Sequence, residues 1–163
     1  MVFRETKNDV FACKLCGHCC EGRGGIVVSK TDLVRLCEFL DLNAESFEGR
    51  WGERRGEKLF IRSDENGCVF FRKGQGCSIH AAKPDICRAW PYFRGNLLDS
   101  ESYALAKDFC PGIPQRQDYE AFVRQGLPYL VQENLVGSSC QDEAVALQVS
   151  DLLETLAHNM GKR

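Results

Sequence analysis

Short apolar runs separated by glycine-rich turns occupy much of the chain before residue 80. The runs at residues 26–28, 59–61 and 68–71 have the length and apolar content of short strands. An Asn66-Gly67 pair lies between the last two runs and predicts a type I′ hairpin. Residues 49–58 are charged and punctuated by glycine, which predicts a solvated loop. This part of the chain is therefore expected to form short strands joined by tight turns.

Helical spacing occurs between these predicted strands and after them. Ser29 and Asp32 form a predicted capping box at the start of a helix. The apolar residues Leu33, Leu36, Cys37 and Leu40 follow at i, i+3, i+4 and i+7, the spacing of one helical face. Asn43 is expected to cap a second short helix. A one-turn helix is expected within 84–91, because proline suits the first turn of a helix and also ends one. Residues 103–106 are expected to form a strand.

The last third of the chain is predicted to be helical. Apolar residues approximate one helical face over 117–136, where Pro128 is expected to kink or split the helix. A second amphipathic helix is expected over 142–160. The predicted fold is α+β: a small, irregular, cysteine-rich core with short strands and helices, followed by amphipathic helices. We expect a metal-binding domain at 1–115 and a helical extension at 116–163 that packs on the same core.

Composition and charge exclude several classes of protein. The 163 residues carry a net charge of −2, so they lack the basic excess that nucleic-acid binding would need. The longest apolar runs span only a few residues, which is too short to cross a membrane. The first seven residues lack the apolar segment of a secretory signal, so a cytoplasmic location is expected.

The exceptional feature is a set of ten cysteines, four of which fall in the octapeptide 13–20. Cytoplasmic thiols stay reduced, so clustered cysteines indicate metal ligands or redox groups, with a disulfide framework as the alternative. Two-residue gaps between Cys13, Cys16 and Cys19 let one turn aim three sulfurs at one point, as in tetrathiolate zinc sites and iron–sulfur loops. Cys20 points elsewhere, which indicates a second metal or a supporting thiol.

Two cysteines are set aside from the expected metal site. Cys37 lies on the apolar stripe of the first predicted helix, where a buried small hydrophobe is expected. Cys140 is a lone thiol in the loop before the last helix. The remaining eight are enough for two four-cysteine sites. They are Cys13, Cys16, Cys19, Cys20, Cys68, Cys77, Cys87 and Cys110.

The motifs around these cysteines resemble those of one family. The order is Cys13-x-x-Cys16-Gly17-x-Cys19-Cys20, Cys68-x-Phe70, Cys77-x-Ile79, Lys83-Pro84-x-x-Cys87-Arg88 and Trp90-Pro91. Over residues 11–111 this order resembles the CxxCxxCC (YkgJ-type) cysteine-cluster proteins. The resemblance implies chelation of zinc or iron, often as an iron–sulfur cluster, and a related cluster occurs in flagellin lysine methylases. His80, Lys83 and Trp90 stand where the family commonly has Tyr, Arg and Phe.

Three functions are compatible with these residues. The leading hypothesis is one or two cysteine-ligated iron–sulfur clusters, of the 4Fe–4S type, with an electron-transfer, sensing or accessory role, since three close thiols followed by distant ones fit iron–sulfur ligation. A zinc-stabilised structural or interaction module is the alternative, because zinc accepts the same four thiolates. A SAM-linked modifying enzyme is the third, although no nucleotide-binding glycine fingerprint or catalytic constellation is present. An unidentified protein partner is compatible with each of them.

Three further side chains are candidates for supporting roles. His18 lies within the cysteine octapeptide, where a supporting or solvent-exposed position is expected. His80 is a candidate to join or replace a thiolate. Arg88 directly follows Cys87 and could either neutralise an anionic thiolate site or pair with an acid in the fold.

Overall fold

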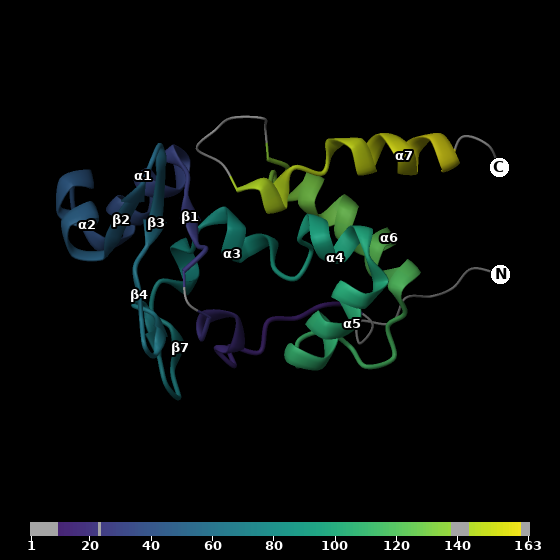
Figure 1. Cartoon of the computed structure of the whole chain (residues 1–163), viewed down its shortest axis with the longest axis horizontal. Coiled ribbons are helices and arrows are strands. Elements are labelled where there is room, and N and C mark those ends of the chain that lie inside the picture. Colours follow the sequence, from purple (N-terminus) through teal and green to yellow (C-terminus); the bar gives the residue numbers. More distant parts are fainter. Residues whose placement is uncertain (1–9, 23, 138–143, 161–163) are drawn as a thin grey trace.

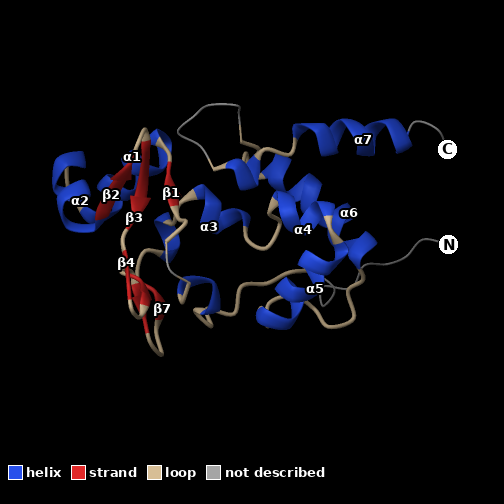
Figure 2. Cartoon of the chain, in the orientation of Figure 1, coloured by secondary structure: helices blue, strands red, loops and turns tan. Residues whose placement is uncertain are grey.

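Three small antiparallel sheets and seven α-helices make up residues 10–22, 24–137 and 144–160, which the computed structural model describes (Figure 2). The helices are α1 (Lys30–Leu40), α2 (Ala44–Trp51), α3 (Asp85–Ala89), α4 (Arg94–Leu98), α5 (Ser100–Phe109), α6 (Tyr119–Gln132) and α7 (Ser150–Met160). The strands are β1 (Val27–Val28), β2 (Gly52–Arg55), β3 (Lys58–Ile61), β4 (Ser63–Asp64), β5 (Gly67–Cys68), β6 (Phe71–Arg72) and β7 (Gly76–Cys77). Single 3-10 turns are η1 (His18–Cys20), η2 (His80–Ala82) and η3 (Val145–Leu147). The predicted α+β class with C-terminal helices is confirmed.

The strands and the later helices lie at opposite ends of the molecule (Figure 1). One sheet has the order β1-β3-β2 and stands beside α1 and α2, while β4–β5 and β6–β7 form two separate hairpins. Helices α4–α7 gather at the other end, and α3 lies between the two groups. The N-terminal segment, purple in Figure 1, runs from α5 to the hairpins beneath α3. This segment contains the cysteine octapeptide, so it links the two ends of the molecule.

Local sequence explains why α1 and α2 begin where they do. The Ser29 hydroxyl accepts a bond from the Asp32 N–H at 3.1 Å, and the Asp32 carboxylate accepts from the Ser29 N–H at 3.0 Å. This is the predicted capping box, which satisfies two of the unpaired amides at the helix start. At α2, the Asn43 side chain accepts from the Ser46 N–H at 2.8 Å. Both predicted helices are therefore confirmed.

The predicted strands at 26–28 and 59–61 are confirmed, but the prediction of a loop over 49–58 is wrong. Within that segment α2 continues to Trp51, and β2 then pairs with β3 across a tight turn. Three of the four side chains of β2 are exposed, so no apolar alternation marks it as a strand. Its place in the sheet comes from backbone bonding to β3, which a side-chain pattern does not reveal.

The hairpin predicted around Asn66-Gly67 is present with a different turn. Asp64 pairs with Gly67, so Glu65 and Asn66 are the two loop residues. Neither loop residue has a positive φ, whereas a type I′ turn requires it at both positions. The Asp64 carboxylate instead accepts from the Asn66 N–H at 2.7 Å and stabilises the turn.

Residues 103–106 belong to α5, so the prediction of a strand there is wrong. The Asp99 carboxylate caps this helix by accepting from the Ser102 N–H at 2.8 Å. Tyr103 and Ala106 are buried one helical turn apart, which is the spacing of an amphipathic helix. All four residues are apolar, and so short a run does not distinguish a strand from a helix.

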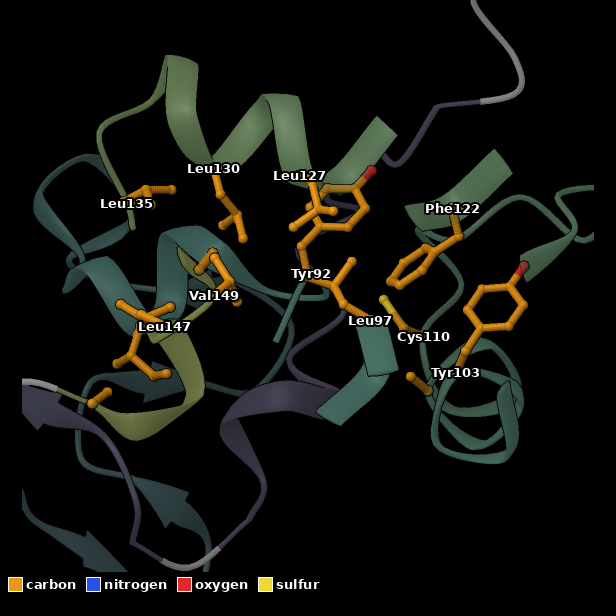
Figure 3. Close-up of a cluster of buried hydrophobic side chains, with 14 of the residues drawn as sticks. Tyr92, Leu97, Tyr103, Cys110, Phe122, Leu127, Leu130, Leu135, Leu147 and Val149 are labelled. Atoms are coloured by element: carbon orange, nitrogen blue, oxygen red, sulfur yellow. The ribbon is translucent and has the colours of Figure 1, made fainter. Parts of the chain in front are cut away.

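Helices α5 and α6 enclose a cluster of aromatic rings (Figure 3). The Tyr92 ring lies 4.9 Å from Phe122, and Phe122 lies 4.6 Å from Tyr103, measured between ring centroids. Gly126 makes the packing possible, because a Cβ at this position would lie 2.3 Å from the Tyr92 ring. The predicted helix over 117–136 is confirmed as α6, with Pro128 inside it.

The last predicted helix is shorter than expected. Residues 138–143 lie outside the described residues, η3 follows, and α7 begins only at Ser150. Leu147 and Val149, which precede α7, are buried in the same apolar cluster as residues of α3, α5 and α6. The domain boundary expected at residue 115 stays a prediction.

A chain of charged side chains connects the two ends of the molecule through α3. Asp32 is 2% exposed and accepts bonds from the Asp85 N–H at 2.9 Å and from Arg35. Arg35 also contacts the Asp85 carboxylate at 2.8 Å. Asp85 in turn binds Arg88 at 3.1 Å, and Arg88 reaches Glu133 just after α6 at 3.3 Å. The first turn of α3 is thus held by a buried carboxylate from α1.

Replacing Asp32 tests this connection. Asp32→Ala is expected to lower the free energy of unfolding of the metal-loaded protein by about 3 kcal/mol. The substitution removes a buried acceptor of the Ser29 and Asp85 N–H groups and one of the two carboxylates that Arg35 contacts. Urea denaturation followed by circular dichroism measures the change. Glu38→Ala removes an exposed carboxylate from the same helix and is expected to change stability by less than about 0.5 kcal/mol. Equal effects of the two substitutions would contradict the assigned role of Asp32.

Candidate metal centre

All eight cysteines selected from the sequence line one cavity of about 420 Å³. They come from the octapeptide, from β5 and β7, from α3 and from the residue after α5. The cavity wall between them is largely apolar. Its apolar side chains include Phe11, Ile26, Ile61, Ile79, Ile86, Trp90, Phe93 and Phe109. Segments separated by as many as 97 positions, from Cys13 to Cys110, therefore present sulfur to a common space.

The start of the cysteine octapeptide is held against the end of α5. The Ala12 N–H donates to the Gly112 carbonyl at 3.1 Å. A Cβ at Gly112 would lie 2.6 Å from the Ala12 carbonyl oxygen, so the two backbones approach closely. The His18 ring packs on Phe109 with centroids 5.4 Å apart, and its Nδ1 lies 2.8 Å from the Phe109 carbonyl oxygen. His18 therefore fastens the octapeptide to α5, which is the supporting position expected for it.

The other end of the octapeptide rests on the two hairpins. Gly67 has a φ of 103°, and a Cβ there would lie 2.2 Å from the Cys20 carbonyl oxygen. Gly17, with a φ of 84°, lies against the Phe71 ring and precedes η1. These contacts leave no room for side chains, so glycine allows the backbones to meet. Close backbone packing, rather than side-chain packing, places Cys19 and Cys20 beside the hairpin that carries Cys68.

The remaining thiols are presented by short, well-bonded elements. Cys77 pairs with Phe71 in the β6–β7 hairpin. Cys87 lies in the middle of α3, and its N–H donates to the Pro84 carbonyl at 2.9 Å. Cys110 follows α5, and its sulfur accepts a bond from Trp90 Nε1 at 3.4 Å. An indole N–H can only donate, so this contact suits a sulfur with anionic character.

Cys19 and Cys20 form a coupled pair of neighbouring thiols. Their sulfurs lie 4.0 Å apart. The bond from Cys20 lowers the pKa of Cys19 to about 6, against the opposing effect of burial and with help from Lys83. The same bond raises the pKa of Cys20. Either sulfur can donate in this contact, so the two thiols share one proton and the first ionisation of the pair is favoured.

Burial keeps three other thiols protonated when no metal is bound. It raises the pKa of Cys68, Cys77 and Cys87. The charge of Cys77 also raises the pKa of Cys68, and the charges of Cys68 and Cys77 raise that of Cys87. Cys19 contributes to the same electrostatic repulsion in all three cases. A bound cation reverses this cost, because metal ligation removes the proton from each coordinating thiol.

Of the two roles considered for Arg88, the structure shows the pairing with acids of the fold, which are Asp85 and Glu133. Lys83 lines the cavity instead, and its Nζ lies 3.4 Å from His80 Nε2. The sequence signals for Lys83 were its position beside Pro84 in a cysteine-bearing motif and the Arg that the resembled family commonly has there. His80 also lines the cavity, although it is exposed.

The two cysteines set aside from the sequence lie elsewhere or are not described. Cys37 lies in α1, packs against the apolar cluster that contains Leu36 and Phe47, and is not among the residues that line the thiol cavity. Cys140 lies outside the described residues. In the described part of the chain, no three His, Cys, Asp or Glu side chains are arranged to hold a single metal ion directly. Metal ligation by the eight thiols therefore stays a prediction.

A family model matches residues 12–111, which contain all eight thiols of the cavity. Its description is "CxxCxxCC: Putative zinc- or iron-chelating domain". The chain belongs to this family. The chemistry of a CxxCxxCC domain is therefore chelation of zinc or iron, and the match confirms the resemblance found in the motifs.

The other comparisons add no relative to this CxxCxxCC chain. No curated protein and no solved structure matches it. Among the described residues, every helix is too short or too polar to cross a membrane.

Paired glycine substitutions test the close packing of the octapeptide. Gly67→Ala forces a Cβ into the Cys20 carbonyl oxygen, so we expect it to reduce the metal bound per chain and to lower stability by more than about 2 kcal/mol. Gly74 also has a positive φ, of 79°, but has open space around it. Gly74→Ala therefore carries only the conformational cost of about 1–2 kcal/mol. Metal analysis and urea denaturation compare the two, and equal metal loss would contradict the assigned contact.

Proposed function

We propose that this protein binds one or two 4Fe–4S clusters through the eight cavity thiols and uses them for single-electron transfer. The observation that carries the proposal is the convergence of these thiols on one cavity of about 420 Å³. When bound, such a cluster supplies reversible one-electron chemistry. The chain's own residues bind it, exclude water from it and adjust its charge.

The size of the cavity favours a cluster over a single ion. In a structural zinc site the four sulfurs lie about 2.3 Å from the metal ion, so such a site is compact and leaves no room for further atoms. The eight thiols instead surround a space large enough to admit a multi-atom group. Three closely spaced cysteines followed by distant ones also fit the ligation of iron–sulfur clusters.

The electrostatic contacts support one assignment of four ligands. In every pair among Cys19, Cys68, Cys77 and Cys87, the charge of one thiol raises the pKa of the other. These four thiols therefore lie within short range of one another. They come from η1, β5, β7 and α3. We assign this quartet to one cluster.

The remaining thiols support a second set. The segments that carry Cys13 and Cys110 are joined by the bond from the Ala12 N–H to the Gly112 carbonyl, and Cys16 lies three positions after Cys13. Cys20 adjoins Cys19 and supplies the fourth sulfur. In this assignment the two neighbouring thiols serve different clusters.

The wall of the cavity suits redox chemistry. Apolar rings and branched side chains line the wall beside the thiols, of which Cys68 and Cys110 are buried while Cys13, Cys16 and Cys19 are exposed. Trp90 donates an N–H bond to Cys110, and such bonds to sulfur tune the potential of a cluster. The nine described cysteines are all free thiols, which is consistent with a reducing compartment such as the cytoplasm. The partner is then a protein that exchanges electrons with the cluster.

Metal and sulfide analysis tests the proposal directly. Protein purified without oxygen is expected to be brown and to contain iron and acid-labile sulfide in equal amounts, near four or eight of each per chain. Visible absorbance that bleaches on reduction by dithionite is the second expected result. Colourless protein with stoichiometric zinc and no sulfide would overturn the iron–sulfur proposal and establish the zinc module.

Cysteine substitutions test the ligand set. Cys87→Ser and Cys13→Ser each remove one proposed ligand, so each is expected to lower the iron content by about half or more, and to destabilise the fold because ligation energy contributes to folding. Cys37→Ser is the matched control, since this thiol does not line the cavity. It is expected to keep the full iron content, and iron loss in this variant would show that the division of the thiols is wrong.

The Trp90 contact gives a finer test of Cys110. Trp90→Phe retains a ring to pack against Phe93 but loses the N–H bond to sulfur. The midpoint potential is expected to fall by up to about 59 mV, equivalent to tenfold in the equilibrium constant for one electron. An anaerobic redox titration measures it. An unchanged potential with full iron content would exclude Cys110 as a ligand of the titrating cluster.

A further inference from the structure

We propose that Lys83 is the charge-compensating residue of the thiol cavity and sets the reduction potential of the cluster bound there. This inference rests on the proposed iron–sulfur function. It assigns Lys83 a positioning role through its charge and not a role as a ligand, because an ammonium group has no lone pair to coordinate a metal.

The backbone of Lys83 is fixed by the ion-pair chain that holds α3. Its carbonyl oxygen accepts a bond from Arg35 Nη2 at 3.1 Å. The next residue, Pro84, is buried and caps α3. The side chain is half-buried and lines the same cavity as the eight thiols. Its position therefore depends on α1 and α3 and not on the metal.

His80 fixes the other end of the side chain. The Lys83 ammonium can only donate, so His80 Nε2 accepts at 3.4 Å and the proton of the ring lies on Nδ1. Although His80 is exposed, partial desolvation of its ring, together with the charge of Lys83, lowers its pKa and favours this neutral form. Because Nε2 is engaged, His80 orients the ammonium and does not present that nitrogen to a metal.

No acid competes for this ammonium among the described residues that line the cavity, since none of them is Asp or Glu. Lys14 also lines it, but its side chain is exposed, so solvent screens its charge. The positive charge of Lys83 favours the ionised forms of Cys19, Cys77 and Cys87, which lie on three different elements. Its field therefore reaches most of the quartet assigned to one cluster.

A nearby cation favours the reduced state of an anionic cluster. Four thiolates give the bound cluster a net negative charge, and one-electron reduction makes that charge more negative. No bond forms or breaks in this step, and the electron comes from a low-potential donor, which is dithionite in the test. Removing the ammonium disfavours the more negative state and lowers the potential, and the partly buried site weakens the effect of solvent screening.

Anaerobic redox titration of three variants tests the inference. Lys83→Met keeps the aliphatic stem and removes the charge, so the equilibrium constant for reduction is expected to fall at least tenfold, which is about 59 mV for one electron. Lys83→Arg restores the charge and is expected to return the constant to within threefold of wild type. Lys73→Met removes an exposed lysine from the β6–β7 turn, outside the cavity, and is expected to match wild type.

Iron and sulfide contents are measured on each sample, so that the comparison uses fully loaded protein. A wild-type protein without a reducible iron–sulfur chromophore would overturn the proposed function and this inference with it. A loaded wild type with an unchanged potential in Lys83→Met, or a potential equally lowered in Lys83→Arg, would overturn the inference alone. If Lys83→Met does not load, a normal potential in loaded Lys83→Gln overturns the inference, and a lowered one supports it.

Discussion

The close approach of the cysteine octapeptide to its neighbours is the constraint on which the rest of the site depends. Thiols are small and contribute little packing energy, so they cannot by themselves draw five segments together. Backbone contacts do this instead, at Gly112 near the start of the octapeptide and at Gly67 near its end. Each contact leaves no space for a Cβ. The octapeptide is thereby stretched between α5 and the hairpins, and the cavity forms along it.

The position of α3 has a separate physical origin. Its first turn binds the buried carboxylate of Asp32 through the Asp85 N–H, and the same ion pairs continue through Arg88 to Glu133. A buried charge tolerates little displacement of its partners, because each broken bond leaves an unpaired polar group in a medium that solvates it poorly. Cys87 and Lys83 are therefore placed by polar contacts on the far side of α3, before any metal contributes.

The sequence was sufficient to select the cysteines that line the cavity, but not to predict the elements and charges around them. Cysteine spacing can be read directly from the sequence, so the eight thiols that line the cavity could be selected without the structure. The capping residues of α1 and α2 could be identified in the same way, from residue type and position. The strand β2 could not be predicted, since its exposed charged side chains carry no pattern and its stability comes from β3. The role of Arg88 could not be decided from the sequence either. Only the three-dimensional positions of Asp85 and Glu133 show that Arg88, within α3, is already paired with acids of the fold.

These observations together define how charge is distributed before and after metal binding. Without metal, burial keeps Cys68, Cys77 and Cys87 neutral, while the shared proton of Cys19 and Cys20 and the charge of Lys83 favour ionisation of Cys19. Three of the cavity thiols therefore add no negative charge beside the apolar wall in the metal-free protein. Ligation replaces the remaining protons with a metal centre, so the negative charge grows only when a cation arrives to offset it. A site of this kind avoids mutual repulsion between several thiolates in the metal-free protein. Its thiols lose their protons when the metal binds.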